Sequence, residues 1–120
     1  LGLNKSTPKV SGSNQKHYCP KTPLYVMNRA EVGKKLDEFL IKNPNNRSYF
    51  YWGFKSLSQG SSFIDQEIAP DNALEYGRIL YRKLNELDRK RYKGIFFESP
   101  PKNYEWEAVN NRLEKASNHS

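Results

Sequence analysis

At 120 residues the chain has room for one domain with a single hydrophobic core, and it is too short for two. Its single cysteine excludes an internal disulfide and a cysteine-based zinc site, and makes a reducing, cytoplasmic location the default. No apolar run approaches the length of a membrane span, so we expect no membrane partner, and the net charge of +7 permits contact with nucleic acid without establishing it.

The leading residues are rich in Ser, Gly, Asn and Lys and offer almost no apolar surface to offset the entropy lost on ordering. We therefore expect a linker at 1–22 that is flexible in isolation, a folded domain at 23–117 and a short tail at 118–120. Because the first residue is Leu1 and not methionine, we also expect the chain to be a segment of a longer polypeptide.

The folded part begins with a short apolar run, "PLYVMN" at 23–28, which favours a strand. Asn28 and Glu31 form a plausible capping pair for a helix that follows directly. Pro44 disfavours continuation of that helix beyond residue 42. Its apolar residues fall on one stripe, as expected for a helix that covers a core: Val32, Leu36, Phe39 and Leu40.

An almost wholly aromatic run, "SYFYWGF" at 48–54, indicates a strand that is buried on both faces in the middle of a sheet. Its rings could also act as stacking platforms for bases, together with Phe96 and Phe97, but runs of this density are far more typical of a core strand. The polar loop "KSLSQGSS" at 55–62 follows. Open α/β sheets bind ligands after such strands, yet this loop matches neither the dinucleotide fingerprint nor the P-loop.

A weaker strand at 63–69 carries Asp65 and Glu67 on one face. The two could act as a carboxylate pair, but a strand that faces solvent carries such residues routinely, and we favour that interpretation. Asp71 is the expected cap of a long helix, and "DRKRYK" at 88–93 places cations where the helix dipole favours them. The apolar residues of this helix follow helical spacing: Ala73, Gly77, Leu80, Leu84 and Leu87.

The segment "GIFFES" at 94–99 is the strongest strand in the chain, and "PPKN" at 100–103 separates it from a last helix. That helix has a single apolar stripe of Trp106, Val109, Leu113 and Ala116. The predicted order is therefore strand, helix, strand, strand, helix, strand, helix. Such alternation predicts an α/β fold with a mostly parallel sheet that is covered by helices on both faces.

Catalytic groups are scarce. The two histidines, His17 and His119, stand in the leading segment and beside the carboxyl terminus, so a nucleophile-base-acid triad or a histidine-rich metal site is not expected. We therefore predict no catalytic residue and no metal site in this chain.

Three motifs together resemble one family, the two-domain threonylcarbamoyladenylate synthases. "KVSGSNQKHYCPKTPLYV" at 9–26 resembles the interdomain linker and the start of the C-terminal domain in that family. "EYGRILYRKLNELD" at 75–88 resembles a helix of the same domain. "GIFFESPP" at 94–101, followed by "EAVNNRLEKAS" at 107–117, resembles its closing strand, proline-rich loop and last helix. The motifs are specific only jointly, and the region from 30 to 70 contributes little.

The resemblance implies that the chain is the C-terminal, Sua-five type domain with its linker, folded as a three-layer α/β/α Rossmann-like sandwich. Enzymes of this family make threonylcarbamoyl-adenylate from threonine, bicarbonate and ATP, for the threonylcarbamoyladenosine modification of tRNA. Their YrdC-type catalytic domain holds the substrates, ATP and magnesium, and it is absent from this sequence. The resemblance thus implies an accessory domain that needs no cofactor, is inactive alone, and has the catalytic domain of the same polypeptide as its partner.

In that family the linker lies across the mouth of the active site. The resemblance therefore implies a lid formed by Ser11, Gly12, Ser13, His17, Tyr18 and Pro20. Pro20 would fix the direction of the chain, and Gly12 would allow a close approach to ligand. Two departures stand out: Cys19 replaces the alanine of the family's His-Tyr-Ala-Pro, and Lys16 stands where many members have an arginine.

Two rival functions stay open. A free-standing basic module could bind tRNA or double-stranded RNA, although its cations are spread in sequence over all three predicted helices. A small nucleotide-binding protein could instead use the switch point of its own sheet.

Overall fold

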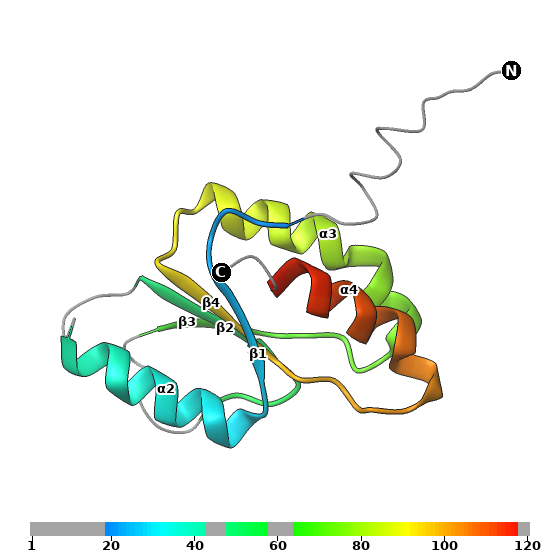
Figure 1. Ribbon diagram of the computed structural model, residues 1–120, viewed down its shortest axis with the longest axis horizontal. Coiled ribbons are helices and arrows are strands. Elements are labelled where there is room, and N and C mark those ends of the chain that lie inside the picture. Colours follow the sequence, from blue (N-terminus) through cyan, green and yellow to red (C-terminus); the bar gives the residue numbers. More distant parts are fainter. Residues whose placement is uncertain (1–18, 43–47, 58–63, 118–120) are drawn as a thin grey trace, which may run out of the picture.

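The computed structural model describes residues 19–42, 48–57 and 64–117 (Figure 1). Its elements appear in the predicted order, with a single turn of 3-10 helix before the last α-helix. They are β1 (Leu24–Met27), α2 (Arg29–Lys42), β2 (Tyr49–Gly53), β3 (Asp65–Ile68), α3 (Ala73–Arg89), β4 (Gly94–Glu98), η2 (Tyr104–Trp106) and α4 (Glu107–Ser117). In this part of the chain, no helix is both long enough and apolar enough to cross a membrane.

The four strands form one sheet in the order β1-β4-β2-β3, and every neighbouring pair is parallel. The two middle strands are the two most apolar segments of the sequence, and nearly all of their residues are buried. The prediction of a central aromatic strand is therefore confirmed. Its rings fill the core: Tyr51, Phe96 and Phe97 are fully buried, as expected for packing and not for base stacking.

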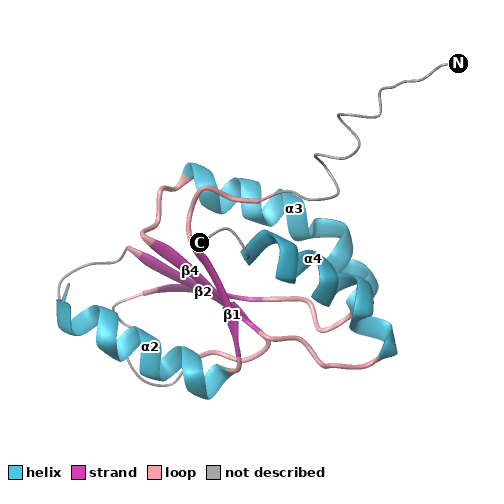
Figure 2. Cartoon of the chain, viewed as in Figure 1, coloured by secondary structure: helices cyan, strands magenta, loops and turns pink. Residues whose placement is uncertain are grey.

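The sheet lies between two helical layers, with α2 on one face and the pair α3 and α4 on the other (Figures 1 and 2). Each layer has its own core. Val32 and Leu36 of α2 pack against Tyr49, Tyr51 and Phe96. On the opposite face, the buried residues of α3 and α4 pack against Phe50, Trp52, Ile95 and Phe97. The predicted α/β/α sandwich is confirmed.

The N-caps of α2 and α3 can be compared with those that the sequence predicted. Asn28 caps α2 as predicted, because its Oδ1 accepts from the backbone N–H of Glu31 at 2.9 Å. The prediction that Asp71 caps α3 is wrong: the cap is Asn72, whose Oδ1 accepts from Glu75 N at 2.9 Å. An N-cap must reach the third helical residue from an extended backbone, and Asp71 lies one residue too early to do so.

The buried stripe of α3 includes two residues that the apolar pattern missed, Tyr76 and Lys83. Tyr76 is 1 % exposed and packs against Trp52 and Trp106, with ring centroids 4.6 and 5.4 Å away. Its hydroxyl has no hydrogen-bond partner among the described residues. The predicted stripe of the last helix is confirmed, since Trp106, Val109, Leu113 and Ala116 are all buried.

Candidate functional site

A parallel sheet gathers the carboxyl ends of its strands at one edge, here called the carboxyl edge. From the neighbouring strands β1 and β4 the chain continues into helices on opposite faces of the sheet, α2 on one side and α4 on the other (Figure 1). Open α/β sheets bind ligands at such a divergence. A ligand site is therefore expected at the carboxyl edge.

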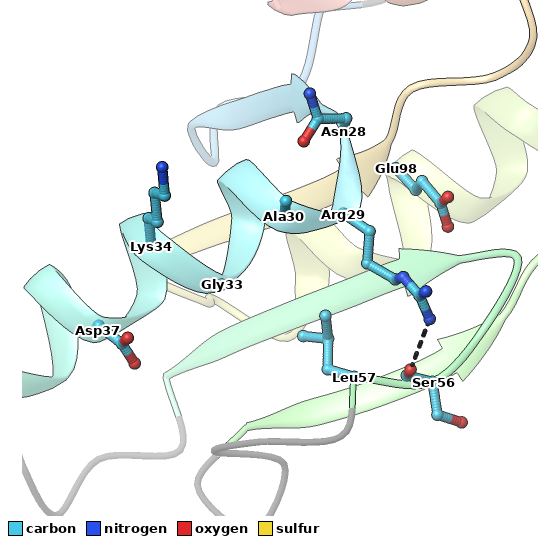
Figure 3. Close-up of a pocket in the computed structure, with 9 residues that line it drawn as sticks. All are labelled: Asn28, Arg29, Ala30, Gly33, Lys34, Asp37, Ser56, Leu57 and Glu98. Atoms are coloured by element: carbon cyan, nitrogen blue, oxygen red, sulfur yellow. Dashed lines mark hydrogen bonds between the residues drawn. The ribbon is translucent and has the colours of Figure 1, made fainter.

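A hollow of 710 Å³ opens at the carboxyl edge (Figure 3). The start of α2 forms one wall, the chain after β2 forms the other, and the end of β4 closes it. Its lining residues are Asn28, Arg29, Ala30, Gly33, Lys34, Asp37, Ser56, Leu57 and Glu98. Ser56 and Leu57 belong to the loop after β2, whose position but not whose sequence is typical of ligand binding in open α/β sheets, and residues 58–62 of that loop lie outside the described residues.

Glu98 connects the ends of the two central strands. Its Oε1 accepts from the Tyr51 hydroxyl at 3.0 Å and from the backbone N–H of Phe54 at 2.8 Å. Burial, and then the hydrogen bond to Glu98, raise the pKa of Tyr51 far above its ordinary value. The phenol therefore stays protonated and keeps donating throughout the physiological range.

Gly53 leaves the space in which the Tyr51 hydroxyl meets the Glu98 carboxylate. A Cβ at this position would lie 2.1 Å from the Tyr51 hydroxyl oxygen and 2.8 Å from Glu98 Oε1, both far inside van der Waals contact. The close approach, and not an unusual backbone angle, requires glycine here. Tyr51, Gly53 and Glu98 therefore form one packed unit at the base of the hollow.

The side chain of Arg29 extends across the hollow toward the chain after β2, and its Nη1 donates to the Ser56 carbonyl at 3.3 Å (Figure 3). The lining carries two cations, Arg29 and Lys34, and two anions, Asp37 and Glu98. This balance gives no preference for a phosphate group. Within the described residues, no group of histidine, cysteine and carboxylate side chains is arranged to hold a metal ion.

The predicted pair Asp65 and Glu67 has structural partners. Glu67 Oε2 lies 2.8 Å from the buried Lys83 Nζ and accepts from Trp52 Nε1 at 3.3 Å, and Asp65 Oδ2 accepts from the Tyr92 hydroxyl at 2.7 Å. The two carboxylates therefore face α3 and the turn after it, and do not simply face solvent as predicted. A structural role, which we favoured over a catalytic pair, agrees with these contacts, although the exposure to solvent on which that interpretation rested does not.

Of the predicted lid residues, Ser11, Gly12, Ser13, His17 and Tyr18 lie outside the described residues. Pro20 is buried. It lies at the edge of the sheet where the strands begin, here called the amino edge. This edge is opposite to the hollow. The structure therefore does not bring Pro20 together with Arg29 or Glu98.

The segment around Pro20 is attached to the ends of two helices. The backbone N–H groups of Lys21 and Thr22 donate to the Asp88 carboxylate at 3.1 and 2.9 Å, and Cys19 Sγ donates to the Ala116 carbonyl at 3.5 Å. Asp88 is near the end of α3 and Ala116 near the end of α4. The chain thus enters the domain from a fixed point.

Sequence reasoning missed Arg29, Tyr51 and Glu98 as a polar group at the carboxyl edge. Each stands at or near the carboxyl end of β1, β2 or β4, and such positions in a parallel sheet are a usable signal. The signal identifies an edge and not a contact, because the strand order must be known before these residues can be placed together.

Comparison with known proteins agrees with this architecture. A family model described as threonylcarbamoyl-AMP synthase, C-terminal domain, matches residues 2–118. The crystal structure of P. abyssi Sua5 complexed with L-threonine matches with a TM-score of 0.62 and 27% sequence identity, over 84% of this chain and 29% of that chain. No curated protein sequence matches at a significant level. Because the family model spans nearly the whole sequence, the chain belongs to the family of threonylcarbamoyl-AMP synthase C-terminal domains.

Proposed function

We propose that this chain is the accessory C-terminal domain, with its linker, of an L-threonylcarbamoyladenylate synthase. The observation that carries the proposal is the family match over residues 2–118. The chain spans only 29% of the P. abyssi Sua5 chain, which leaves room there for a separate catalytic domain. In this proposal a YrdC-type domain of the same polypeptide holds threonine, bicarbonate, ATP and magnesium, and the product serves the threonylcarbamoyladenosine modification of tRNA.

The contribution of the present chain is to hold a lid over that catalytic domain. The lid consists of Ser11, Gly12, Ser13, His17 and Tyr18, with Pro20 at its base. A lid needs a fixed hinge, and the bonds from Lys21 and Thr22 to Asp88 provide an attachment of that kind. This attachment supports the proposal, because it fixes the segment next to Pro20, at the base of the proposed lid, to the folded domain.

Water exclusion gives the lid a chemical purpose. A carboxylated threonine loses carbon dioxide, and the mixed anhydride of threonylcarbamoyl-adenylate hydrolyses, so premature opening wastes ATP. Closure by the linker would hold the carboxylated threonine until it reacts with ATP and would keep water from the threonylcarbamoyl-adenylate until its release. The domain thereby affects the yield per ATP without supplying a reacting group.

The test uses the two-domain protein and measures threonylcarbamoyl-adenylate formed per ATP consumed. We expect His17→Ala together with Tyr18→Phe to lower this ratio roughly tenfold, if about 1.4 kcal/mol of closure free energy is lost. For His17→Ala alone the melting temperature of the C-terminal domain should hardly change, because in this proposal His17 acts on the catalytic domain. An unchanged ratio with a lower melting temperature would show that the two residues are structural. The 120-residue chain alone should give no product above a buffer blank.

A free-standing RNA-binding module is the weaker candidate for the whole function, because the family match covers almost all of the sequence. The placement of cations in the fold nevertheless favours contact with RNA as a second property. The sequence suggested that cations are spread over all helices, whereas the structure gathers several of them at the amino edge.

A further inference from the structure

Five exposed cations surround the point where the chain enters the domain. They come from the entering segment and from the end of α3 with the turn after it: Lys21, Arg89, Lys90, Arg91 and Lys93, here called the basic patch. The two parts lie side by side in Figure 1 and are joined by the bonds to Asp88. Segments that are far apart in sequence thus form one cationic surface.

Four of the five cations in the basic patch form no ion pair among the described residues. Three other cations of the described residues have carboxylate partners: Lys35 with Glu38, Arg78 with Glu75, and Lys83 with Glu67 and Glu86. By contrast, Lys21, Arg89, Lys90 and Arg91 have no carboxylate within 4.0 Å among the described residues. The Asp88 carboxylate lines the same hollow, and it accepts from the amides of Lys21 and Thr22.

The helix dipole explains only part of the patch. It favours cations in the last turn of α3, which accounts for Arg89 and its neighbour Lys90. Arg91 lies beyond the helix with φ of 59°, in the left-handed region that glycine prefers. A non-glycine residue there costs about 1 kcal/mol, so an arginine at this position is unfavourable for folding. Such a residue suggests that its side chain has a separate use.

The patch surrounds a hollow of 570 Å³ lined by Lys21, Thr22, Pro23, Asp88, Arg89, Arg91 and Tyr92. Its cations can pair with phosphate oxygens, and the guanidinium groups can do so with two parallel hydrogen bonds. Pro23 and the half-buried ring of Tyr92 add apolar surface at the same place. The patch thus offers cations for phosphates and an apolar surface for bases. This combination fits a nucleotide chain better than it fits an acidic protein surface.

We propose that the basic patch binds the phosphate backbone of RNA. The charge and shape of the patch indicate a nucleic acid, and the choice of RNA rests on the proposed function in tRNA modification. The patch lies where the linker enters, so bound RNA would lie beside the lid and away from the hollow at the carboxyl edge. RNA binding and lid closure are separate properties and can fail separately.

The test measures binding of the 120-residue chain to fluorescently labelled tRNA by anisotropy, over a range of salt concentrations. For four phosphate contacts, the logarithm of the affinity should fall with the logarithm of salt with a slope of about −3. The double variant Arg89→Gln with Arg91→Gln should bind about tenfold more weakly and with a slope smaller by about one to two. A slope near zero, or no binding at low salt, would overturn the proposal.

A matched control separates a local site from the effect of net charge. Lys34→Gln with Lys102→Gln removes the same charge from exposed positions at the opposite edge. We expect less than a twofold change for this pair, and equal weakening by both pairs would refute a defined patch. Binding to vesicles of equal parts phosphatidylcholine and phosphatidylserine that matches or exceeds binding to tRNA would also overturn the choice of RNA.

The single variant Arg91→Gly excludes a purely structural explanation. Glycine relieves the left-handed conformation, so the free energy of unfolding should rise by about 1 kcal/mol while the affinity for tRNA falls several-fold. If Arg91 only supports the fold, stability should fall and affinity should follow it. The yield of threonylcarbamoyl-adenylate in the two-domain protein tests the lid independently, so failure of one proposal leaves the other testable.

Discussion

At the carboxyl edge of the sheet, the charges around the hollow are balanced, and Arg29 and Glu98 have hydrogen-bond partners, whereas at the amino edge cations stand exposed around the incoming chain. Glu98 accepts two hydrogen bonds in the first region. In the second, Arg89, Lys90 and Arg91 have no carboxylate partner among the described residues. The Glu98 carboxylate is therefore fixed in the first region, whereas the second region presents these cations to solvent.

The same feature of the fold produces both regions. In this parallel sheet the helices run opposite to the strands, so helix starts meet at the carboxyl edge and helix ends at the amino edge (Figure 1). The first turns carry Glu31, Glu75 and Glu107, and the last turns carry Lys42, Arg89 and Lys115. Each charge stabilises its own helix dipole, and together they separate charge along the molecule.

The largest effect is expected from Gly53→Ala at the carboxyl edge. The new Cβ would overlap the Tyr51 hydroxyl, which cannot move without losing its bond to Glu98. Overpacking and the lost hydrogen bond together should lower the free energy of unfolding by about 3 kcal/mol, as measured by urea denaturation.

Gly33 provides the control for that substitution. It lies on the wall of the same hollow, and an added Cβ there meets nothing within 4 Å. Because alanine favours helix, Gly33→Ala should stabilise the chain by about 0.8 kcal/mol. Equal destabilisation by both substitutions would show that the close approach at Gly53 has no special importance.

The second prediction concerns the amino edge. Asp88→Ala removes the acceptor for the amides of Lys21 and Thr22, and hydrogen bonds to a charged group are worth about 2 kcal/mol. We expect the free energy of unfolding to fall by about that amount, and amide hydrogen exchange at Lys21 and Thr22 to accelerate. Asp88→Asn, which keeps one acceptor oxygen, should cost less. Unchanged exchange at both amides would contradict the proposed attachment.

The sequence predicted the element order because apolar spacing is a local signal, visible in "SYFYWGF" and in the stripe that ends at Ala116. It did not predict the bonds of Glu98, since Tyr51 is 47 residues away and becomes a neighbour only in the order β1-β4-β2-β3. The run of cations at 88–93 was visible in the sequence and was assigned to the helix dipole, but its meeting with Lys21 was missed, because Lys21 and Arg89 come together through the fold alone. Local caps were predicted at Asn28 and missed at Asn72, where two adjacent residues have suitable side chains.

The smallest predicted effect appears only in alkaline solution and compares the two edges directly. Burial and hydrogen bonds to Glu98 and Asp65 raise the pKa of Tyr51 at the carboxyl edge and of Tyr92 toward the amino edge. In the unfolded chain both phenols titrate near their ordinary pKa of about 10. The folded chain therefore binds more protons above that pH. The stability due to these phenols is complete below about pH 10 and is lost as the pH rises further.

A fully buried tyrosine contributes a slope of at most about 1.4 kcal/mol per pH unit in that range. Tyr51 is fully buried, so Tyr51→Phe should flatten the alkaline decline more than Tyr92→Phe, whose ring is partly exposed. The measurement is the free energy of unfolding by urea from pH 8 to pH 12, with phenolate absorbance followed in parallel. Equal flattening by both variants would mean that the two edges shield their phenols alike, and a decline unaffected by either would assign the loss to the buried phenol of Tyr76, whose pKa is also raised by burial.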